Sequence, residues 1–235
     1  MENNLVKIKL CGLSRPVDID YVNEAKPDYC GFIINVPKSI RNTTPDQVRA
    51  LREKLSPDII PVGVFRNEPV ETVAGLLLDG TISVAQLHGS EDEAYIQQLR
   101  SFGDFTIFKA FRALAVEQRA DSGENAVSSA NTAGEHGNSD VLAAWADMVN
   151  KSSADMVLLD NGGGGTGKTF EWALTDLITR PFLLAGGIGP DNITEALDRL
   201  HPWGVDMSSS VETDGKKDRE KMLQAVAKVR ERKET

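Results

Sequence analysis

Short apolar segments recur along the chain, and each is followed by a segment in which apolar residues return every three or four positions. Most of the apolar segments are continuous rather than alternating, as is typical of parallel strands that are buried on both faces. We therefore expect eight strands, at Val6–Leu10, Tyr29–Asn35, Ile60–Phe65, Ser83–Leu87, Thr106–Ala110, Met156–Asp160, Phe182–Ala185 and Val205–Ser208.

Helical patterns fill the intervals between these strands. The clearest helix opens at Thr44-Pro45-Asp46, which supplies an N-cap residue, a proline in the first position and an acidic first turn, and it continues at helical spacing to Leu55. Further helices are expected at Val17–Ala25, Pro69–Leu78, Glu91–Leu99, Val141–Val149, Phe170–Ile178, Pro190–Leu200 and Arg219–Arg232.

Strand and helix alternate eight times, and with right-handed crossovers this order favours one closed α/β domain, a single (β/α)₈ barrel of eight parallel strands. The alternative is an open doubly wound sheet. Such a sheet often carries G-x-G-x-x-G after its first strand, whereas here the glycine-rich segments follow the sixth and seventh strands. The closed barrel is therefore the predicted fold over residues 1–235.

The interval between the fifth and sixth strands is longer than the others. Its excess, at about 115–140, is rich in Ala, Ser, Asn, Gly and Glu and carries almost no large apolar residue, so we interpret it as a flexible loop insertion. A passive surface insertion is one interpretation. A lid is the other, because this loop leaves the end of the barrel where such enzymes hold their sites.

Composition and charge narrow the function. A hydrophobic content of 40% with 26% charged residues is ordinary for a globular protein, and the net charge of −9 argues against a nucleic-acid partner. The first residues do not form a signal-peptide core, no apolar run is long enough for a membrane span, and two cysteines do not make a disulfide scaffold. A cytoplasmic protein fits these observations. The three histidines show no metal-ligand spacing.

Candidate chemistry lies where the predicted strands end, because barrel enzymes build their sites there. Three segments can present backbone amides to a phosphate: the glycine-rich 161–167, Gly186-Gly187 after strand seven, and Ser208-Ser209-Ser210 after strand eight, where a short helix is expected to begin. The alternative is that these glycines only form tight turns. Their combination at the recurrent phosphate position of barrels favours an anion site.

Two strand ends carry candidate acid–base groups. Cys11 ends strand one, two residues after Lys9, and a thiol becomes a base near neutral pH when a positive charge lowers its pKa. Asp160 ends strand six directly before the glycine-rich loop, and partial burial there would keep a proton available for donation. The alternatives are an inert buried thiol and a turn-forming aspartate. Cys30, at the other end of its strand, is predicted to be structural.

Two further strand ends offer weaker candidates. Arg41 follows strand two and could bind a carboxylate with its planar guanidinium, although arginines on loops are common. His88 follows strand four in Gln86-Leu87-His88-Gly89, and we expect it to support the loop rather than to catalyse.

Together these segments resemble the phosphoribosylanthranilate isomerases of tryptophan biosynthesis. The resemblance spans nearly the whole chain, and its motifs occur in the same order as in the family. These motifs are Lys9-Leu10-Cys11-Gly12, Gly63-Val64-Phe65 with Asn67, Gln86-Leu87-His88-Gly89, Leu158-Leu159-Asp160 with Gly164–Gly167 and Phe170-Glu171-Trp172, Leu184–Ile188 with Pro190 and Asn192, and Val205-Asp206 with Ser208-Ser209, Val211-Glu212 and Gly215 with Lys217-Asp218.

The resemblance implies an Amadori rearrangement of a phosphorylated sugar-anthranilate substrate that needs no cofactor. It implies that Asp160 is the general acid, that Cys11 is the general base and that Arg41 holds the anthranilate carboxylate. It places the phosphate against a group of residues in three loops, which are Gly165, Thr166, Gly167, Gly186, Gly187, Ser208, Ser209 and Ser210. A monomer or a homodimer is compatible with the sequence.

Two departures from the family pattern are visible. Leu10 replaces an Ile or Val and keeps an apolar contact, whereas Ser210 replaces a glycine and would be strained if its φ were positive. Two rivals are the related histidine-pathway isomerase, whose catalytic positions are both aspartates, and a phosphosugar-binding barrel without activity. Cys11 at the first position argues against the former, and the presence of both Cys11 and Asp160 argues against the latter.

Overall fold

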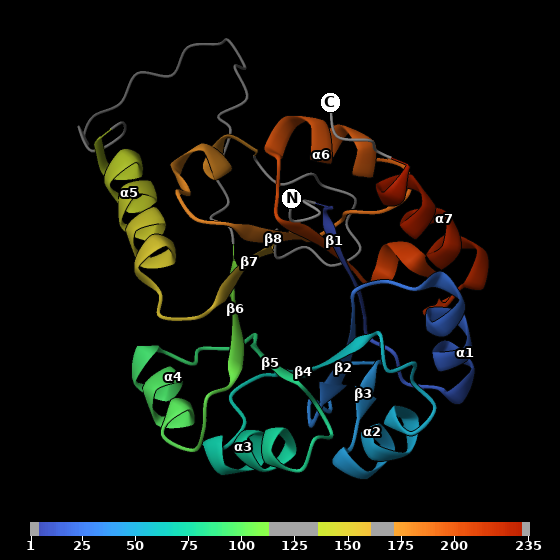
Figure 1. The fold of residues 1–235 in the computed structure, drawn as a ribbon. Coiled ribbons are helices and arrows are strands. Elements are labelled where there is room, and N and C mark those ends of the chain that lie inside the picture. Colours follow the sequence, from blue (N-terminus) through green and yellow to red (C-terminus); the bar gives the residue numbers. More distant parts are fainter. Residues whose placement is uncertain (1–4, 113–135, 161–171, 232–235) are drawn as a thin grey trace, which may run out of the picture.

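The computed structural model describes residues 5–112, 136–160 and 172–231. Eight parallel strands form a closed ring, and the helices surround it (Figure 1). The strands of the ring are β1 (Lys7–Cys11), β2 (Tyr29–Ile34), β4 (Ile60–Phe65), β5 (Val84–Leu87), β6 (Thr106–Arg112), β7 (Met156–Asp160), β8 (Phe182–Ala185) and β9 (Gly204–Met207). The predicted barrel is confirmed.

The ring closes because β1 pairs with the last strand on one side and with β2 on the other. Lys9 lies opposite Asp206 of β9, and Cys11 lies opposite Gly31 of β2. Every pairing in the ring is parallel, so the carboxyl ends of all eight strands meet at one end of the barrel. The open-sheet alternative is therefore wrong.

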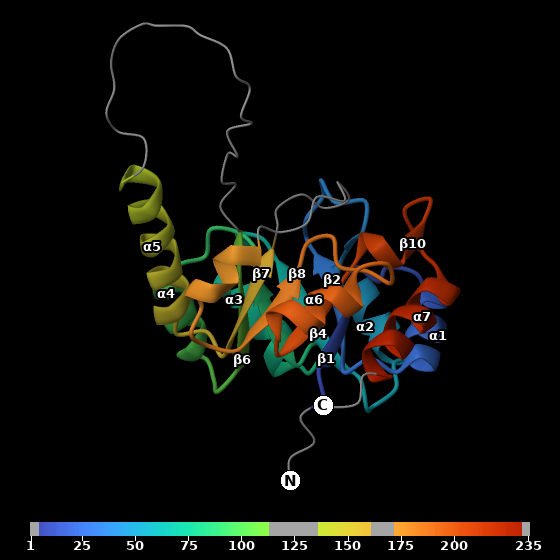
Figure 2. The same cartoon turned by 90° about the horizontal axis from the view of Figure 1, so that it is seen from above.

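The helices follow the predicted intervals and run alongside the strands, as the side view in Figure 2 shows. They are α1 (Pro16–Ala25), α2 (Pro45–Arg52), α3 (Val70–Leu78), α4 (Glu93–Arg100), α5 (His136–Lys151), α6 (Ile193–Leu200) and α7 (Arg219–Arg230). Caps set several of their starts: the Thr44 side chain accepts a hydrogen bond from the Gln47 amide, and Asp218 accepts one from Lys221.

The structure differs from the prediction in some elements. The described part of the helix expected at Phe170–Ile178 is a 3₁₀-helix, η1 (Trp172–Leu177), and the short helix expected near Ser209 is the 3₁₀ turn η2 (Ser209–Val211). Three two-residue strands were not predicted: β3 (Asn42–Thr43), β10 (Glu212–Thr213) and β11 (Lys216–Lys217). Isolated two-residue pairings leave no periodic signal in a sequence.

Most of the insertion predicted at about 115–140 lies outside the described residues. The described chain ends at Arg112 and resumes at His136, where α5 already begins, so this helix starts five residues before the predicted Val141. Among the described helices, none is long and apolar enough to cross a lipid bilayer.

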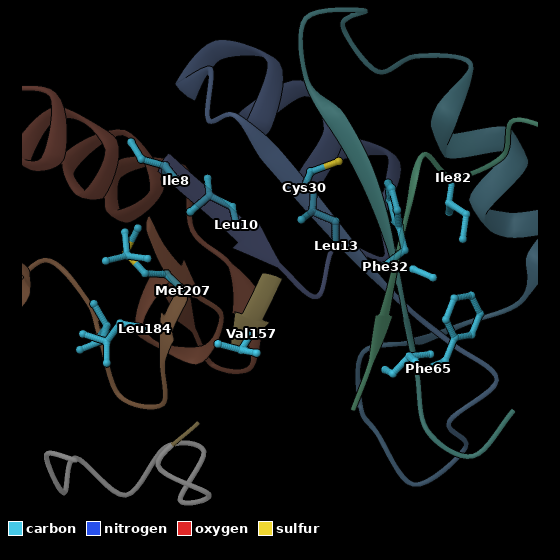
Figure 3. Close-up of a cluster of buried hydrophobic side chains, with 14 of the residues drawn as sticks. Ile8, Leu10, Leu13, Cys30, Phe32, Phe65, Ile82, Val157, Leu184 and Met207 are labelled. Atoms are coloured by element: carbon cyan, nitrogen blue, oxygen red, sulfur yellow. The ribbon is translucent and has the colours of Figure 1, made fainter. Parts of the chain in front are cut away.

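Two apolar layers stabilise the barrel. The inner layer fills the ring and includes Val64, Phe108, Leu158 and Leu183. Cys11 belongs to the same layer and lies at the carboxyl end of β1. The larger outer layer lies between the ring and the helices, and Figure 3 shows members of it, including Phe32, Leu184 and Cys30. The two cysteines thus lie on opposite sides of the barrel wall.

Candidate active site

A cavity of about 260 Å³ opens at the end of the barrel where the strands finish. The structure brings most of the predicted site residues to its wall. They come from the ends of β1, β7, β8 and β9 and the loops that follow, namely Cys11, Asp160, Gly186, Gly187, Ser208, Ser209 and Ser210. Arg41 does not line this cavity, and Gly165, Thr166 and Gly167 lie outside the described residues.

The thiol of Cys11 lies beside the amino group of Lys9, and a glycine makes room for both. A Cβ atom at Gly31 on the neighbouring strand would approach Cys11 Sγ to 2.7 Å and Lys9 Nζ to 3.2 Å. Any side chain at position 31 would therefore displace the thiol or the amino group. Lys9 is fully buried, and its Nζ donates to Asp206 Oδ1 at 2.8 Å.

The electrostatic balance at Cys11 differs from the prediction. Burial raises the pKa of the Cys11 thiol, Lys9 lowers it, Asp206 raises it again, and the net direction is upward. The predicted positive neighbour is present, but it is itself paired with a buried carboxylate and does not outweigh the loss of hydration. The expectation that the thiol has a lowered pKa is therefore wrong.

Asp160 ends β7 at the cavity wall and contacts the imidazole of His88. Oδ2 of Asp160 lies 3.1 Å from His88 Nε2, and the other ring nitrogen, Nδ1, lies 3.0 Å from the Gln86 side-chain nitrogen. Gln86 is 1% exposed, while His88 and Asp160 remain partly open to the cavity. A row of three side chains therefore runs from the barrel interior to Asp160.

From the sequence, no role was predicted for Gln86, and His88 was expected only to support its loop. One signal was available: residues two apart on a strand point to the same face, so Gln86 and His88 share a direction at the end of β5. The contact between Asp160 and His88 depends on the tertiary structure, because 72 residues separate them in the sequence.

Arg41 is paired with Glu212 instead of facing the cavity. Its Nε and Nη2 atoms donate to the two carboxylate oxygens at 2.6 and 2.5 Å, and Glu212 also accepts from Lys217 at 2.5 Å. The hydrogen bonds to Glu212 raise the pKa of Arg41. This network ties the loop after β2 to the β10–β11 hairpin, so it braces the segment that begins at Ser208.

The loops after β8 and β9 are held in contact by their own hydrogen bonds. Gly186 and Gly187 have φ values of 81° and 82°, which an L side chain rarely adopts. The Ser210 hydroxyl donates to the Ile188 carbonyl at 2.5 Å, and the Ser208 hydroxyl donates to the Cys11 carbonyl at 3.1 Å. The backbone of these loops is thereby fixed around one side of the cavity.

Comparison with known proteins decides the family. The model of the N-(5'-phosphoribosyl)anthranilate (PRA) isomerase family matches residues 8–134 and 136–228. The chain belongs to this family. It is therefore an enzyme, an isomerase.

Full-length relatives and solved structures agree with the family match. N-(5'-phosphoribosyl)anthranilate isomerase of Thermoanaerobacter sp. (strain X514) is 39% identical over 228 residues, which cover 96% of this chain and 98% of the relative. That of Endomicrobium trichonymphae is 38% identical over 225 residues, covering 94% and 96%. The crystal structure of the Thermus thermophilus enzyme has a TM-score of 0.72 at 30% identity and covers 96% of this chain and 98% of its own.

A structure with a bound molecule is also similar. It is a phosphoribosyl anthranilate isomerase in complex with reduced 1-(o-carboxyphenylamino)-1-deoxyribulose 5-phosphate, with a TM-score of 0.69 and 26% identity, and the match covers 96% of this chain and 99% of that one.

Ser210, which departs from the pattern of the isomerase family, does not have the positive φ that would strain a serine. The described non-glycine residues with positive φ are Lys26, Asn35, Asn67, His201 and Asp214, and Ser210 is not one of them. The serine replaces a glycine without a backbone penalty and gains the hydrogen bond to Ile188. The condition for strain at this position, a positive φ, is therefore not met.

The described residues contain no cluster of three or more His, Cys, Asp or Glu side chains suited to a metal ion. The cavity wall offers a thiol, a carboxyl group, an imidazole and backbone amides, which are groups that move protons and bind anions.

Proposed function

We propose that the protein converts N-(5'-phosphoribosyl)anthranilate to 1-(2-carboxyphenylamino)-1-deoxyribulose 5-phosphate in tryptophan biosynthesis, with Asp160 as general acid and Cys11 as general base. The observation that carries the proposal is that both side chains line one cavity, beside the fixed loops after β8 and β9. The complex of a relative with a reduced form of this product supports it.

Two proton transfers, one from Asp160 and one to Cys11, convert the substrate to the enolamine. Asp160 donates a proton to the furanose ring oxygen as the C1′–O bond breaks, and the ring opens to a protonated Schiff base. Cys11, as thiolate, then removes the C2′ proton, and the electron pair of that C–H bond forms the enolamine, which tautomerises to the ketose. These two steps pass the negative charge from Cys11 to Asp160. The tautomerisation adds a proton at C1′ and removes one from the C2′ hydroxyl, which together return one proton from Cys11 to Asp160 and restore the thiolate and the acid. Because the reaction is redox-neutral and moves only protons, the proposal requires no cofactor.

The phosphate group is proposed to bind at the loops after β8 and β9. Gly186, Gly187 and Ser208–Ser210 line the cavity there, and their conformations are set by positive φ angles and by inter-loop hydrogen bonds. This is the position at which barrels most often bind phosphate. We propose that Gly165, Thr166 and Gly167 contribute further backbone amides from the loop after β7.

Replacing Ser210 by glycine is expected to weaken phosphate binding by roughly 2- to 10-fold, because the substitution removes one hydrogen bond between the two loops. The inhibition constant of inorganic phosphate, measured in the isomerase assay, tests this expectation. Ser210→Ala is the matched control, since it removes the same hydroxyl without adding backbone freedom, and it should weaken binding to a similar or smaller extent. Tighter phosphate binding by Ser210→Gly would show that the tie to Ile188 has no role.

Arg41 is proposed to hold the anthranilate carboxylate. Its Nε–Nη2 edge is occupied by Glu212, whereas a guanidinium has a second edge, at Nη1 and Nη2, that can still form two parallel hydrogen bonds. Pairing with Glu212 holds the planar group in one orientation. Arg66, which does line the cavity and is exposed, is the competing cation.

Arg41→Ala is expected to raise KM for the substrate by roughly 10- to 100-fold with a smaller change in kcat, because a charged hydrogen-bonding partner of the substrate is lost. The matched control is Arg66→Ala, which removes a positive charge from the same cavity. N-(5'-phosphoribosyl)aniline, which has no carboxylate, should depend on Arg41 much less than the natural substrate does, since it loses only the support that the Arg41–Glu212 pair gives to the segment after Ser208. A larger KM effect from Arg66→Ala than from Arg41→Ala would transfer the carboxylate role to Arg66.

The direct test of the function is the loss of phosphoribosylanthranilate fluorescence on addition of purified protein. Turnover of this substrate, absent with the Cys11→Ala and Asp160→Ala variants, is the expected result. Binding of the substrate without turnover would instead support the rival, a phosphosugar-binding barrel without activity.

We further propose that the chain is a single-domain cytoplasmic enzyme that works as a monomer or a homodimer. A relative from Thermotoga maritima is described as a dimeric phosphoribosylanthranilate isomerase from which monomers were generated, so a dimer occurs among similar proteins. Analytical ultracentrifugation of the full chain distinguishes them.

A further inference from the structure

His88 and Gln86 have no place in the two proton transfers, yet both line the cavity beside Asp160. Gln86 lies on β5 with its side chain buried, and His88 is the first residue after that strand. The His88 amide donates to the Phe65 carbonyl at 2.8 Å, so the backbone at the start of this loop is fixed to the neighbouring strand. The imidazole is therefore presented to Asp160 from a rigid position.

The two hydrogen bonds to the ring favour one tautomer of a neutral imidazole. The Gln86 side-chain N–H donates to Nδ1, which must then be an acceptor, so the proton of a neutral imidazole is on Nε2. That Nε2–H in turn donates to Oδ2 of Asp160 at 3.1 Å. Because Oδ2 accepts this bond, a proton on the carboxyl group is favoured on the other oxygen.

The side-chain nitrogen of Gln86 contacts His88, but its side-chain oxygen is left without a hydrogen-bond partner among the described residues. This Oε1 atom is buried. A buried unpaired acceptor destabilises a fold, and an apolar side chain of the same size would avoid it. The glutamine is therefore better explained by what its amide nitrogen does to His88 than by stability.

We propose that Gln86 holds His88 in its Nε2–H tautomer and that His88 is a positioning residue for the acid step, stabilising the carboxylate that forms when Asp160 gives up its proton. This inference rests on the proposed role of Asp160. The hydrogen bond from Nε2–H becomes charge-assisted only as the carboxylate develops, so it favours the transition state over the ground state. Its loss lowers kcat and leaves KM nearly unchanged.

Two substitutions of nearly equal shape separate this role from packing. His88→Gln places an amide N–H near the position of Nε2, whereas His88→Met fills similar space without a donor. We expect His88→Met to lower kcat by roughly 10- to 100-fold, as the loss of an outer partner of a reacting group commonly does, with KM changed by less than about 3-fold. His88→Gln should recover most of the loss. Equal kcat values for the two variants would overturn the proposal.

Gln86→Leu gives a second, opposite readout. Removal of the unpaired buried oxygen should leave the melting temperature unchanged or raised, while kcat falls by about 10-fold because the tautomer is no longer held. A merely structural glutamine would show the reverse, a lower melting temperature with unchanged kcat, and that result contradicts the proposal.

Nitrogen NMR of the imidazole tests the tautomer without reference to activity. The ¹⁵N shifts of His88, assigned by comparison with His88→Gln, should show a protonated Nε2 and an unprotonated Nδ1 in the wild-type protein. A protonated Nδ1 overturns the inference. Failure of the wild-type protein to turn over the substrate would instead refute the proposed function, so the two failures are distinguishable.

Discussion

Cys11→Ala is expected to lower kcat by at least about 100-fold, which corresponds to about 2.7 kcal/mol of transition-state stabilisation. The thiolate is the proposed base for the C2′ proton, and alanine has no group that can accept it. KM should change by only a few-fold, since the proposed phosphate and carboxylate contacts come from other loops. Steady-state kinetics by fluorescence measure both constants. Near-native turnover by this variant would remove Cys11 from the mechanism.

Cys30→Ala is the matched control for this substitution. Both thiols are buried, and burial raises the pKa of each, but Cys30 lies in the apolar layer between the ring and the helices. Its loss should lower the melting temperature slightly, because a small cavity is left, and should leave kcat unchanged. If both variants lose activity equally, the effect is one of packing.

The pH dependence of kcat/KM follows from the balance of charges around Cys11. A base acts only when it is deprotonated, and burial raises the pKa of this thiol above its ordinary value despite the opposing effect of Lys9. The active fraction should therefore increase with pH above neutrality, by up to about 10-fold per pH unit until the pKa is reached. Loss of the Asp160 proton lowers kcat/KM at the other side of the profile, so the rising limb is the test: a pH profile without a rising limb that disappears in Cys11→Ala would contradict the assignment.

The eight strands and their order could be predicted from the sequence because their apolar runs are bounded by polar or glycine-rich segments. The prediction for Tyr29–Asn35 exceeds the observed β2 by only one residue, since Asn35 has a positive φ that ends the strand. Closure of the ring followed from the count of alternations, and no pattern in any single strand encodes it.

Part of the candidate site could be predicted because barrel enzymes build their sites at the carboxyl ends of the strands. Cys11, Asp160 and the serines after β9 were found because each ends a strand of the barrel or directly follows one. Asp160 was assigned without its neighbour His88, which a sequence cannot place beside it. The signal at Gln86 and His88 was their spacing of two, which shows a shared face but no partner.

The charge network and the pKa direction could not be predicted, for the same physical reason. Arg41 and Glu212 are separated by 171 positions, and their pairing depends on how two loops lie after the barrel closes. The pKa of Cys11 depends on burial and on the pairing of Lys9 with Asp206, and neither can be known before the ring is built. The pKa of a buried group depends on its burial and on the charges packed against it, more than on the residues next to it in the sequence.

Asp160→Asn is expected to lower kcat by at least about 100-fold, because the amide keeps the shape of the carboxyl group but has no acidic proton for the ring oxygen. The substrate should still bind, so KM should stay within a few-fold of the wild-type value. The same variant should open the furanose ring slowly, and a reduced substrate that already lacks the closed ring should bind as tightly as to the wild-type protein. Loss of that binding would assign Asp160 to substrate recognition instead of acid catalysis.

Asp155→Asn provides the control at the other end of the same strand. Asp155 directly precedes β7, accepts a hydrogen bond from the Ile107 amide at 2.7 Å and pairs with Arg100. It is therefore the same type of residue at the opposite end of β7, and it does not line the cavity. Asparagine retains an oxygen that can accept from Ile107, so stability should fall only slightly and kcat should be unchanged. Because the acid step needs a carboxyl group at the cavity wall and not merely next to β7, only the Asp160 substitution should slow ring opening. A comparable loss of kcat in Asp155→Asn would mean that strand charge or stability, rather than proton donation, explains the effect of Asp160.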